Sequence, residues 1–248
     1  MSSNSTENRR GLPGGGPSFM APTLWLTGET VEYPVTAEDR AALSVIATIV
    51  RYRRGATIYE EGGDAGSVFN VITGLVKSCR ILPDNKQHVV GFLSPNDLIG
   101  LAENGKYVNT AEAATAVTLY RMPAVAIEAR LRRNAELDFH VIGKLCHELR
   151  EAQDHSFLLS RHRAVAKLGL FLKMLESQQV LLGAGGGEVF LQMSRSDIGS
   201  YAGVSAETVS RSLRDLASRG IIGFRDRRHL QILDWPLLEA TIAETTVH

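Results

Sequence analysis

Three polar residues at helical spacing carry the most informative chemistry in the chain. Glu207, Ser210 and Arg211 stand at positions i, i+3 and i+4, which share one face of an α-helix. An arginine donates a two-pronged pair of hydrogen bonds to guanine, a glutamate accepts from cytosine, and a serine bonds to either kind of base edge. The same spacing also suits a surface ion pair between Glu207 and Arg211, a pairing that contributes only about 0.3–0.5 kcal/mol.

The segments around these residues favour contact with DNA bases. Ser194 followed by Asp197 is a capping arrangement that predicts a helix through Tyr201. A short turn containing Gly203 follows, and a serine then caps a second predicted helix over 206–219. Helix, short turn and helix form the helix-turn-helix pattern, in which the second helix enters the major groove of DNA.

A predicted β-hairpin follows the second helix. Two apolar runs, 221–224 and 229–233, flank the basic sequence Arg225-Asp226-Arg227-Arg228, so we expect a wing with a basic tip. The polar residues beside the base-contacting face suit phosphates or helix caps, and they are Ser194, Ser196, Ser205, Thr208 and Arg214.

Charge is distributed unevenly along the chain. The total is 27 basic and 27 acidic residues, but 161–228 holds eleven Lys and Arg against six Asp and Glu, a local net charge of +5. This segment is therefore the part expected to bind a polyanion.

Composition excludes several other classes of protein. The chain has 248 residues, 44% of them hydrophobic, and only two cysteines, so a disulfide scaffold and a four-thiolate metal site within one subunit are excluded. No paired acid–base motif, nucleophile elbow or phosphate-binding loop supports an enzyme. We find neither a membrane-spanning run nor a signal peptide, and we expect a soluble, cytoplasmic protein without membrane contact.

The segments before residue 123 differ in composition and in the secondary structure that they predict. Residues 1–30 are rich in Ser, Gly and Pro and predict a flexible tail, and 38–50 predicts a short helix. Between Tyr52 and Met122, short β-branched runs alternate with Gly, Asn and Asp turns, which indicates an antiparallel sandwich or barrel. The expected strands include 57–59, 68–72, 75–81 and 88–93.

Beyond Pro123 an apolar pattern recurs at the alternating spacing of a coiled-coil seam. The predicted seam consists of Ile142, Leu145, Leu149, Ala152 and Leu159, with Ser156 interrupting it. A helix packed on its own domain would also fit, but the narrow stripe favours a two-fold dimer helix.

Taken together, these features resemble the CRP/FNR family of bacterial transcription regulators, in its FNR/FixK branch, over about residues 35–235. Residues 55–62 and 96–100 match the turns of the family's β-roll, and 193–211 matches its helix-turn-helix. Within that stretch Glu207-x-x-Ser210-Arg211 resembles the signature that recognises TTGAT-like half-sites.

The resemblance implies an α+β fold with five segments. After the tail at 1–30 come an antiparallel β-roll of the cyclic-nucleotide-binding, jelly-roll type at 31–122 and a long dimerisation helix at 123–160. A winged helix-turn-helix follows at 161–236, with a C-terminal tail at 237–248. It also implies a homodimer that binds double-stranded DNA at an inverted repeat, usually activating transcription through RNA polymerase.

The chain departs from the family where effectors bind. Cyclic-nucleotide-binding members follow the turn glycine with Glu and later carry Arg-Ser, whereas Gly100 is followed here by Leu101 and the later stretch is 108–111, Val-Asn-Thr-Ala. The N-terminal cysteine cluster of iron–sulfur members is also missing. We therefore expect no cofactor, no metal and effector-independent DNA binding.

Two alternatives stay open. One is an effector-gated small-molecule or haem sensor of the same fold, with candidate haem ligands His88, His140, His147 and His155. The other is a redox switch at Cys79 or Cys146, set against two small apolar residues without a redox role.

Overall fold

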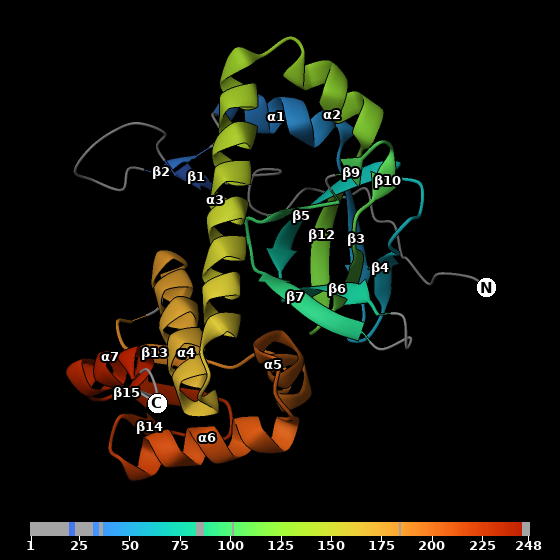
Figure 1. Ribbon diagram of the computed structural model, residues 1–248. Helices are drawn as coiled ribbons and strands as arrows, with labels where there is room; N and C mark the ends of the chain where they lie inside the picture. The colour runs from blue at the N-terminus through green and yellow to red at the C-terminus, as the bar shows by residue number, and fades with distance from the viewer. Residues whose placement is uncertain are drawn as a thin grey trace. The chain divides into compact units, whose positions relative to one another are not determined.

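The computed structural model describes residues 20–22, 32–34, 37–82, 87–100, 102–183 and 185–244 (Figure 1). The chain divides into two compact units, Met1–Ala152 and Gln153–His248. No helix in the described ranges is long and apolar enough to cross a membrane.

The first unit is built on two four-stranded antiparallel sheets, as the strand pattern predicts. One sheet has the order β4-β11-β6-β7, with β4 at Thr57–Tyr59, β11 at Thr110–Ala113, β6 at Val76–Ile81 and β7 at Gln87–Leu93. The other has the order β3-β12-β5-β8, with β3 at Thr48–Tyr52, β12 at Val117–Pro123, β5 at Ser67–Thr73 and β8 at Leu98–Ile99. Two short strand pairs accompany them, β1 (Met20–Pro22) with β2 (Glu32–Pro34) and β9 (Ala102–Glu103) with β10 (Lys106–Tyr107).

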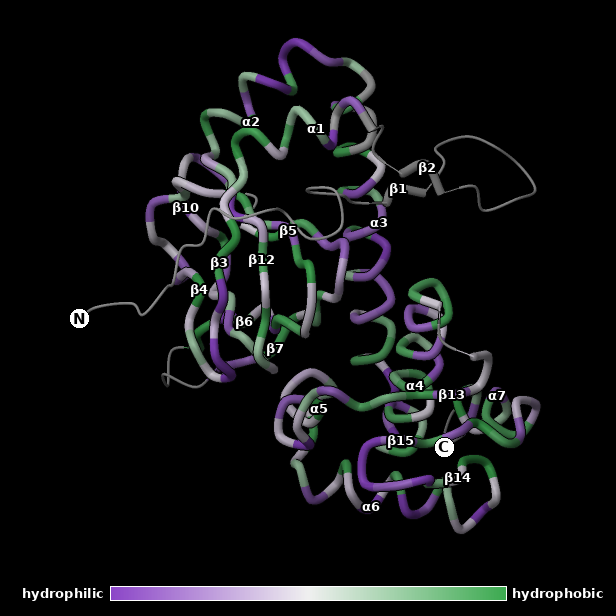
Figure 2. The backbone as a smooth tube through the Cα atoms, turned by 180° about the vertical axis from the view of Figure 1, so that it is seen from behind, coloured by the Kyte–Doolittle hydropathy of each residue, from purple (hydrophilic) through white to green (hydrophobic). Residues whose placement is uncertain are grey.

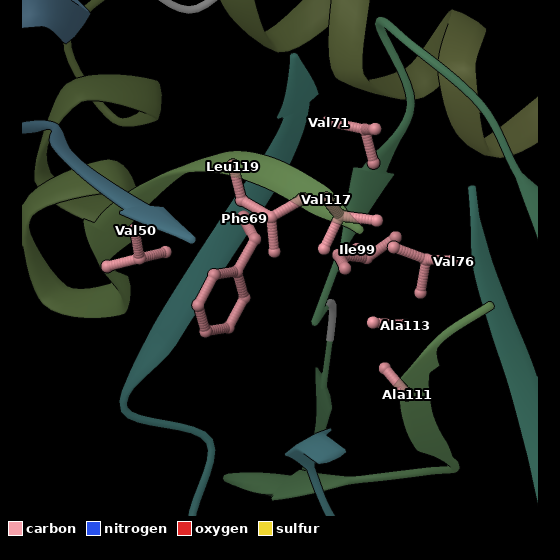
Figure 3. Packing of buried hydrophobic residues seen from close by; sticks show 9 residues of the cluster. All are labelled: Val50, Phe69, Val71, Val76, Ile99, Ala111, Ala113, Val117 and Leu119. Carbon is pink, nitrogen blue, oxygen red and sulfur yellow. The ribbon is translucent and has the colours of Figure 1, made fainter. Parts of the chain in front are cut away.

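Alternation along the strands divides the apolar residues of this unit between two cores. Phe69 packs with Val71, Val76 and Leu119 in one buried cluster (Figure 3). Its neighbour Val68 belongs to a second cluster, because successive strand residues point to opposite faces of a sheet. The second cluster joins that sheet to three helices, α1 (Ala37–Ile46), α2 (Ala124–Leu131) and the start of α3 (Ala135–Ser160).

The second unit contains the predicted winged helix-turn-helix. It comprises α4 (Ala164–Leu181), β13 (Glu188–Phe190), α5 (Arg195–Ala202), α6 (Ala206–Ser218), β14 (Ile222–Phe224), β15 (His229–Ile232) and α7 (Trp235–Ala243). Its three strands form an antiparallel sheet in the order β13-β15-β14. The predicted α+β fold class, with an antiparallel β domain, a long helix and a C-terminal helix-turn-helix, is therefore confirmed.

The helix predicted over 38–50 is wrong at its C-terminal end. Helix α1 stops at Ile46, and Thr48-Ile49-Val50 begins strand β3, which pairs with β12. The β-branched residues of this run are better suited to a strand than to a helix, and pairing with β12 places Ile49 and Val50 in the buried interior.

The single dimerisation helix predicted over 123–160 is two helices. Helix α2 ends at Leu131, and α3 starts at Ala135. The carbonyl oxygen of the Asn134 side chain accepts a hydrogen bond from the backbone N–H of Leu137 at 3.0 Å, so Asn134 caps the start of α3.

The C-terminal tail predicted over 237–248 is also wrong for most of its length. Helix α7 continues to Ala243; Asp234 caps it, and Pro236 stands in its first turn. Leu238 and Ile242 are buried, and the approach of their side chains to Gly169 of α4 explains why the helix docks there.

The predicted flexible tail at 1–30 lies largely outside the described residues. Its residues Met20–Pro22 form a strand that pairs with Glu32–Pro34.

A buried ion pair fixes the first half of α3 to the turn before β8. Lys144 is only 2% exposed, and its Nζ lies 2.5 Å from Oδ1 of Asp97. Burial alone would lower the pKa of Lys144, but the charge and the hydrogen bond of Asp97, together with the charges of Glu148 and Glu151, outweigh burial and raise it. Glu148, one turn further along α3, keeps one buried carboxylate oxygen without a hydrogen-bond partner.

The turn between α5 and α6 depends on a glycine inside α5. A Cβ added at Gly199 would lie 2.6 Å from the carbonyl oxygen of Val204 and 3.2 Å from the backbone nitrogen of Ala206. The backbone N–H of Val204 also donates to the carbonyl oxygen of Gly199 at 2.9 Å. Both atoms that a Cβ would meet belong to the backbone and cannot move aside as a flexible side chain could, so only glycine fits at this position.

We expect Glu148→Gln to raise stability at pH 8 and to change it little at pH 5. Burial raises the pKa of Glu148 to about 7, so the folded chain holds this proton after the unfolded chain has lost it. The wild-type protein therefore loses stability as pH rises from about 4.5 to about 7, by at most about 3 kcal/mol. Urea unfolding across this pH range measures the effect, with the exposed Glu128→Gln as the control. Parallel pH profiles for Glu148→Gln and the wild type would contradict the prediction.

We expect Gly199→Ala to destabilise the second unit by about 1–3 kcal/mol, because the added methyl group meets fixed backbone atoms. Gly186→Ala is the matched control, since a Cβ there meets nothing within 4 Å. Thermal unfolding of both variants gives the comparison. Equal melting temperatures for the two variants would show that the turn tolerates a side chain.

Candidate nucleic-acid interface

Both helices of the helix-turn-helix begin at the predicted caps. Oγ of Ser194 accepts from the backbone N–H of Asp197 at 3.0 Å, and the Asp197 carboxylate accepts from the backbone N–H of Ser194 at 3.1 Å, which completes a capping box. Oγ of Ser205 accepts from the backbone N–H of Thr208 at 3.1 Å. Gly203 joins the helices with a φ of 66°, in the left-handed region that glycine adopts without strain.

Helix α6 is held by one face only. Val209, Leu213 and Leu216 are fully or almost fully buried, as their spacing predicts. The opposite face of the helix is exposed and polar. Strong division between two faces is what lets a helix stay attached to its domain while it enters a groove.

The three predicted base-contacting residues meet on that exposed face. The Glu207 and Arg211 side chains are 81% and 68% exposed, and an oxygen of Glu207 lies 3.5 Å from a guanidinium nitrogen of Arg211. The Ser210 hydroxyl donates to the carbonyl oxygen of Ala206 at 3.0 Å, so its oxygen remains available as an acceptor. An ion pair this exposed is weak and easily exchanged for contacts to bases.

The five predicted phosphate contacts fall into two groups. Ser194 and Ser205 are helix caps, and the hydroxyl of Thr208 lies 2.9 Å from Oγ of Ser205. Ser196 is exposed, and Arg214, also exposed, donates from Nε to the carbonyl oxygen of Ser210 at 3.2 Å. Whether any of them contacts phosphate stays a prediction.

The predicted wing lies between β14 and β15, at the place that the sequence indicates. Its tip, Arg225 to Arg228, is hydrophilic (Figure 2) and exposed. Asp226, within this tip, accepts hydrogen bonds from two backbone N–H groups. Arg195, on α5, donates to the carbonyl oxygen of Arg227 at 3.2 Å. In the sequence, the only hint of a structural role for Asp226 is that a single acidic residue stands within an otherwise basic run.

Aromatic side chains of the β domain pack close to Gly100, the turn glycine at which the chain departs from the cyclic-nucleotide-binding pattern. Tyr59 stacks on Tyr107 with ring centres 4.0 Å apart. A Cβ on Gly100 would lie 2.9 Å from the carbonyl oxygen of Ser67 and 3.3 Å from the rings of Phe69 and Tyr107. Leu101, the first departure from the family pattern, lies outside the described residues.

The later departure, at 108–111, bonds to the β domain itself. Oγ1 of Thr110 accepts from the backbone N–H of Glu61 at 3.0 Å, and Oδ1 of Asn109 accepts from the hydroxyl of Tyr59 at 3.4 Å. Nearby cations are paired as well, Lys77 with Glu112 at 3.0 Å and Arg80 with Glu61 at 2.8 Å.

The candidate haem ligands whose side chains are described differ in their surroundings. His155 is buried, its ring stacks on Tyr201 at 3.9 Å, and its Nε2 lies 2.8 Å from the Tyr201 carbonyl oxygen. His147 pairs with Glu151 on its own helix, and His88 lies on strand β7. The side chain of His140 lies outside the described part of the structure. Among the described residues, no group of three or more His, Cys, Asp or Glu could hold a metal ion.

The two cysteines differ in exposure. Cys79 is buried on β6, as expected of a small apolar residue, whereas Cys146 is exposed on α3 beside the predicted dimer seam.

Comparisons with known proteins agree with this architecture. A cyclic nucleotide-binding domain model matches residues 49–134, and a Crp-like helix-turn-helix domain model matches residues 166–241. The nitrogen fixation regulation protein FixK of Rhizobium meliloti (strain 1021) is 32% identical over 193 residues, which is 78% of this chain and 86% of the relative.

Two further matches extend the comparison. The transcriptional activator protein anr of Pseudomonas aeruginosa is 28% identical over 203 residues, 81% of this chain and 83% of the relative. The solved structure of FixK2 from Bradyrhizobium japonicum matches with a TM-score of 0.74 at 31% identity, and covers 81% of this chain and 99% of that one. The chain therefore belongs to the CRP/FNR family of transcription regulators, which are not enzymes, and it is a DNA-binding regulator of the FixK/FNR type.

Proposed function

We propose that the protein is a cytoplasmic transcription activator that binds, as a homodimer, an inverted repeat of TTGAT-like half-sites. The observation that carries the proposal is the exposed face of α6, where Glu207, Ser210 and Arg211 stand together at the start of a capped helix. The names of two relatives support a regulatory role, one in nitrogen fixation and one as an activator. RNA polymerase is the partner through which such an activator works.

Each of the three side chains has a base that suits it. Arg211 can donate two parallel hydrogen bonds to guanine, Glu207 can accept from cytosine, and Ser210 can bond to either kind of edge. All three lie in the first two turns of α6, the part of a recognition helix that reaches base edges. Ser194, Ser196, Ser205, Thr208 and Arg214 would hold the helix to the backbone through phosphates.

An exposed apolar stripe on α3 supports a dimer. Ile142, Leu145, Leu149 and Leu159 are 46%, 45%, 62% and 37% exposed, and Ala152 is exposed between them. A second copy of α3 would cover this stripe, because the same seven-residue pattern is self-complementary about a two-fold axis. Dimerisation would place two recognition helices about 34 Å apart, which requires an inverted repeat of the same spacing.

DNA binding without an effector is the expected mode of action. The paired cations of the β domain support it, since Lys77 and Arg80 each already have an acidic partner within the domain. The competing function is an effector-gated small-molecule or haem sensor. The cyclic nucleotide-binding type of β domain and the histidines of the chain would allow such a sensor. Control would then require a ligand before any specific binding occurs.

We expect Arg211→Ala to weaken binding to a TTGAT inverted repeat by about 1–3 kcal/mol and to change binding to random DNA much less, because its contact is to a base. Arg214→Ala is the matched control and should weaken both to a similar degree, because its contact is to phosphate. Equilibrium binding of the protein without added ligand measures both. Equal losses on the two duplexes for Arg211→Ala would assign Arg211 to the backbone, and a wild-type protein that prefers the repeat only with a ligand would favour the sensor.

We expect Leu149→Glu, and likewise Leu145→Glu, to shift the protein from dimer to monomer and to lower its affinity for the inverted repeat. A buried carboxylate in an apolar seam must be desolvated without a partner. Val125→Glu on α2 is the control, because Val125 is also an exposed apolar residue, at 78%, but lies outside the stripe. Sedimentation equilibrium reports the oligomeric state, and a Leu149→Glu protein that stays dimeric would place the interface elsewhere.

A further inference from the structure

The wing tip contains a negative charge whose sign alone would oppose DNA binding. Arg225, Arg227 and Arg228 would attract phosphates, but Asp226 stands among them and lowers the local positive charge. From charge alone, removal of this carboxylate should strengthen binding. The contacts of Asp226 indicate the opposite.

Asp226 holds the tip together from inside. Its Oδ1 accepts hydrogen bonds from the backbone N–H groups of Arg228 at 2.7 Å and of His229 at 2.8 Å, and its Oδ2 lies 2.6 Å from Nδ1 of His229. These backbone bonds, followed by the His229 side chain, lower the pKa of Asp226 to about 2, so the carboxylate is ionised at neutral pH. One side chain of the tip thus holds both Arg228, the last tip residue, and His229, the first residue of β15.

The tip is also attached to the rest of the unit. The His229 ring stacks on Phe190 of β13 at 4.4 Å and 7°, and the two residues are partners in the β13–β15 register. The backbone N–H of Leu191 donates to the carbonyl oxygen of Arg228 at 2.8 Å. The ring that Asp226 contacts is therefore itself held in place by the sheet.

Arg195 provides a second connection, from the first helix of the helix-turn-helix. One of its terminal nitrogens donates to the carbonyl oxygen of Arg227 at 3.2 Å, and the other is buried without a partner. Its side chain therefore spans from α5 to the wing tip, so the tip is fixed relative to the helices that meet the major groove.

We propose that Asp226 is a positioning residue for DNA binding, which sets the wing tip in its binding shape before DNA arrives so that Arg225, Arg227 and Arg228 meet the phosphate backbone together. The inference rests on the proposed function only in taking the wing to lie on the same DNA as α6. Ordering a long side chain at an interface lowers affinity, and an arginine on a fixed loop has less freedom left to lose. The benefit of a fixed tip thus outweighs the repulsion between Asp226 and phosphate.

Three variants of the full-length protein separate shape from charge. Asp226→Ala removes both the charge and the hydrogen bonds. Asp226→Asn removes the charge but keeps an oxygen that can accept from the two backbone N–H groups. Asp154→Ala removes an exposed carboxylate on α3, away from the wing, and is the control for net charge.

Binding is measured to a TTGAT inverted repeat and to a random duplex over a range of salt concentrations. We expect Asp226→Ala to bind both duplexes about threefold to tenfold more weakly than the wild type, with a shallower salt dependence. Asp226→Asn should bind at least as tightly as the wild type, and Asp154→Ala should be unchanged. Asp226→Ala binding as tightly as the wild type, or more tightly, would overturn the proposal.

A second measurement uses the wild-type protein and does not depend on how the variants fold. Hydrogen exchange of the free protein should show protected amides at Arg228 and His229, because both donate to Asp226. Exchange at the rate of an unstructured peptide would overturn the proposal. If the wild type shows no preference for the repeat over random DNA, the proposed recognition sequence fails, but the comparison on random DNA still tests Asp226.

Discussion

Attachment of α6 through one face is the constraint on which the DNA-binding unit depends. The buried side chains of Val209, Leu213 and Leu216 hold the helix against its domain, so the opposite, polar face points to solvent. The close backbone contact at Gly199 fixes the angle at which α6 leaves the turn. A helix that lost either restraint could still present Arg211, but in a range of directions, and a two-pronged hydrogen bond to a base depends on direction.

The proposed contacts divide binding between two kinds of group. Side chains at the start of α6 would discriminate between bases, whereas the wing would supply affinity that is independent of sequence and sensitive to salt. The structure gives these groups different supports. The α6 residues rest on a packed helix, and the wing residues rest on hydrogen bonds from Asp226 and Arg195. With the wing and α6 both held in this way, each protomer of the proposed dimer would contact base edges and backbone with little reordering.

Most of the DNA-binding unit could be predicted from sequence, because its signals are local. Ser194 and Ser205 each cap a helix by a hydrogen bond to a residue three positions later, so both helix starts can be predicted from a few neighbouring residues. The missed features depend on contacts between distant segments. The capping residue Asp234 could have indicated the start of α7 from sequence. The helix docks, however, because Gly169 of the distant α4 leaves space for its side chains. Likewise, nothing in the sequence near Lys144 predicts its burial against Asp97, which lies far away in the chain.

The most direct test of the account is the reactivity of guanine N7 in the major groove. The protein without added ligand, bound to a TTGAT inverted repeat, is treated with a methylating reagent, and each guanine is compared with free DNA. If α6 presents Arg211 to a guanine in each half-site, the guanine of both half-sites should be protected, symmetrically about the centre of the repeat. Full reactivity of both guanines in a saturated complex would contradict the account, because it would show that the protein holds the DNA without entering the groove.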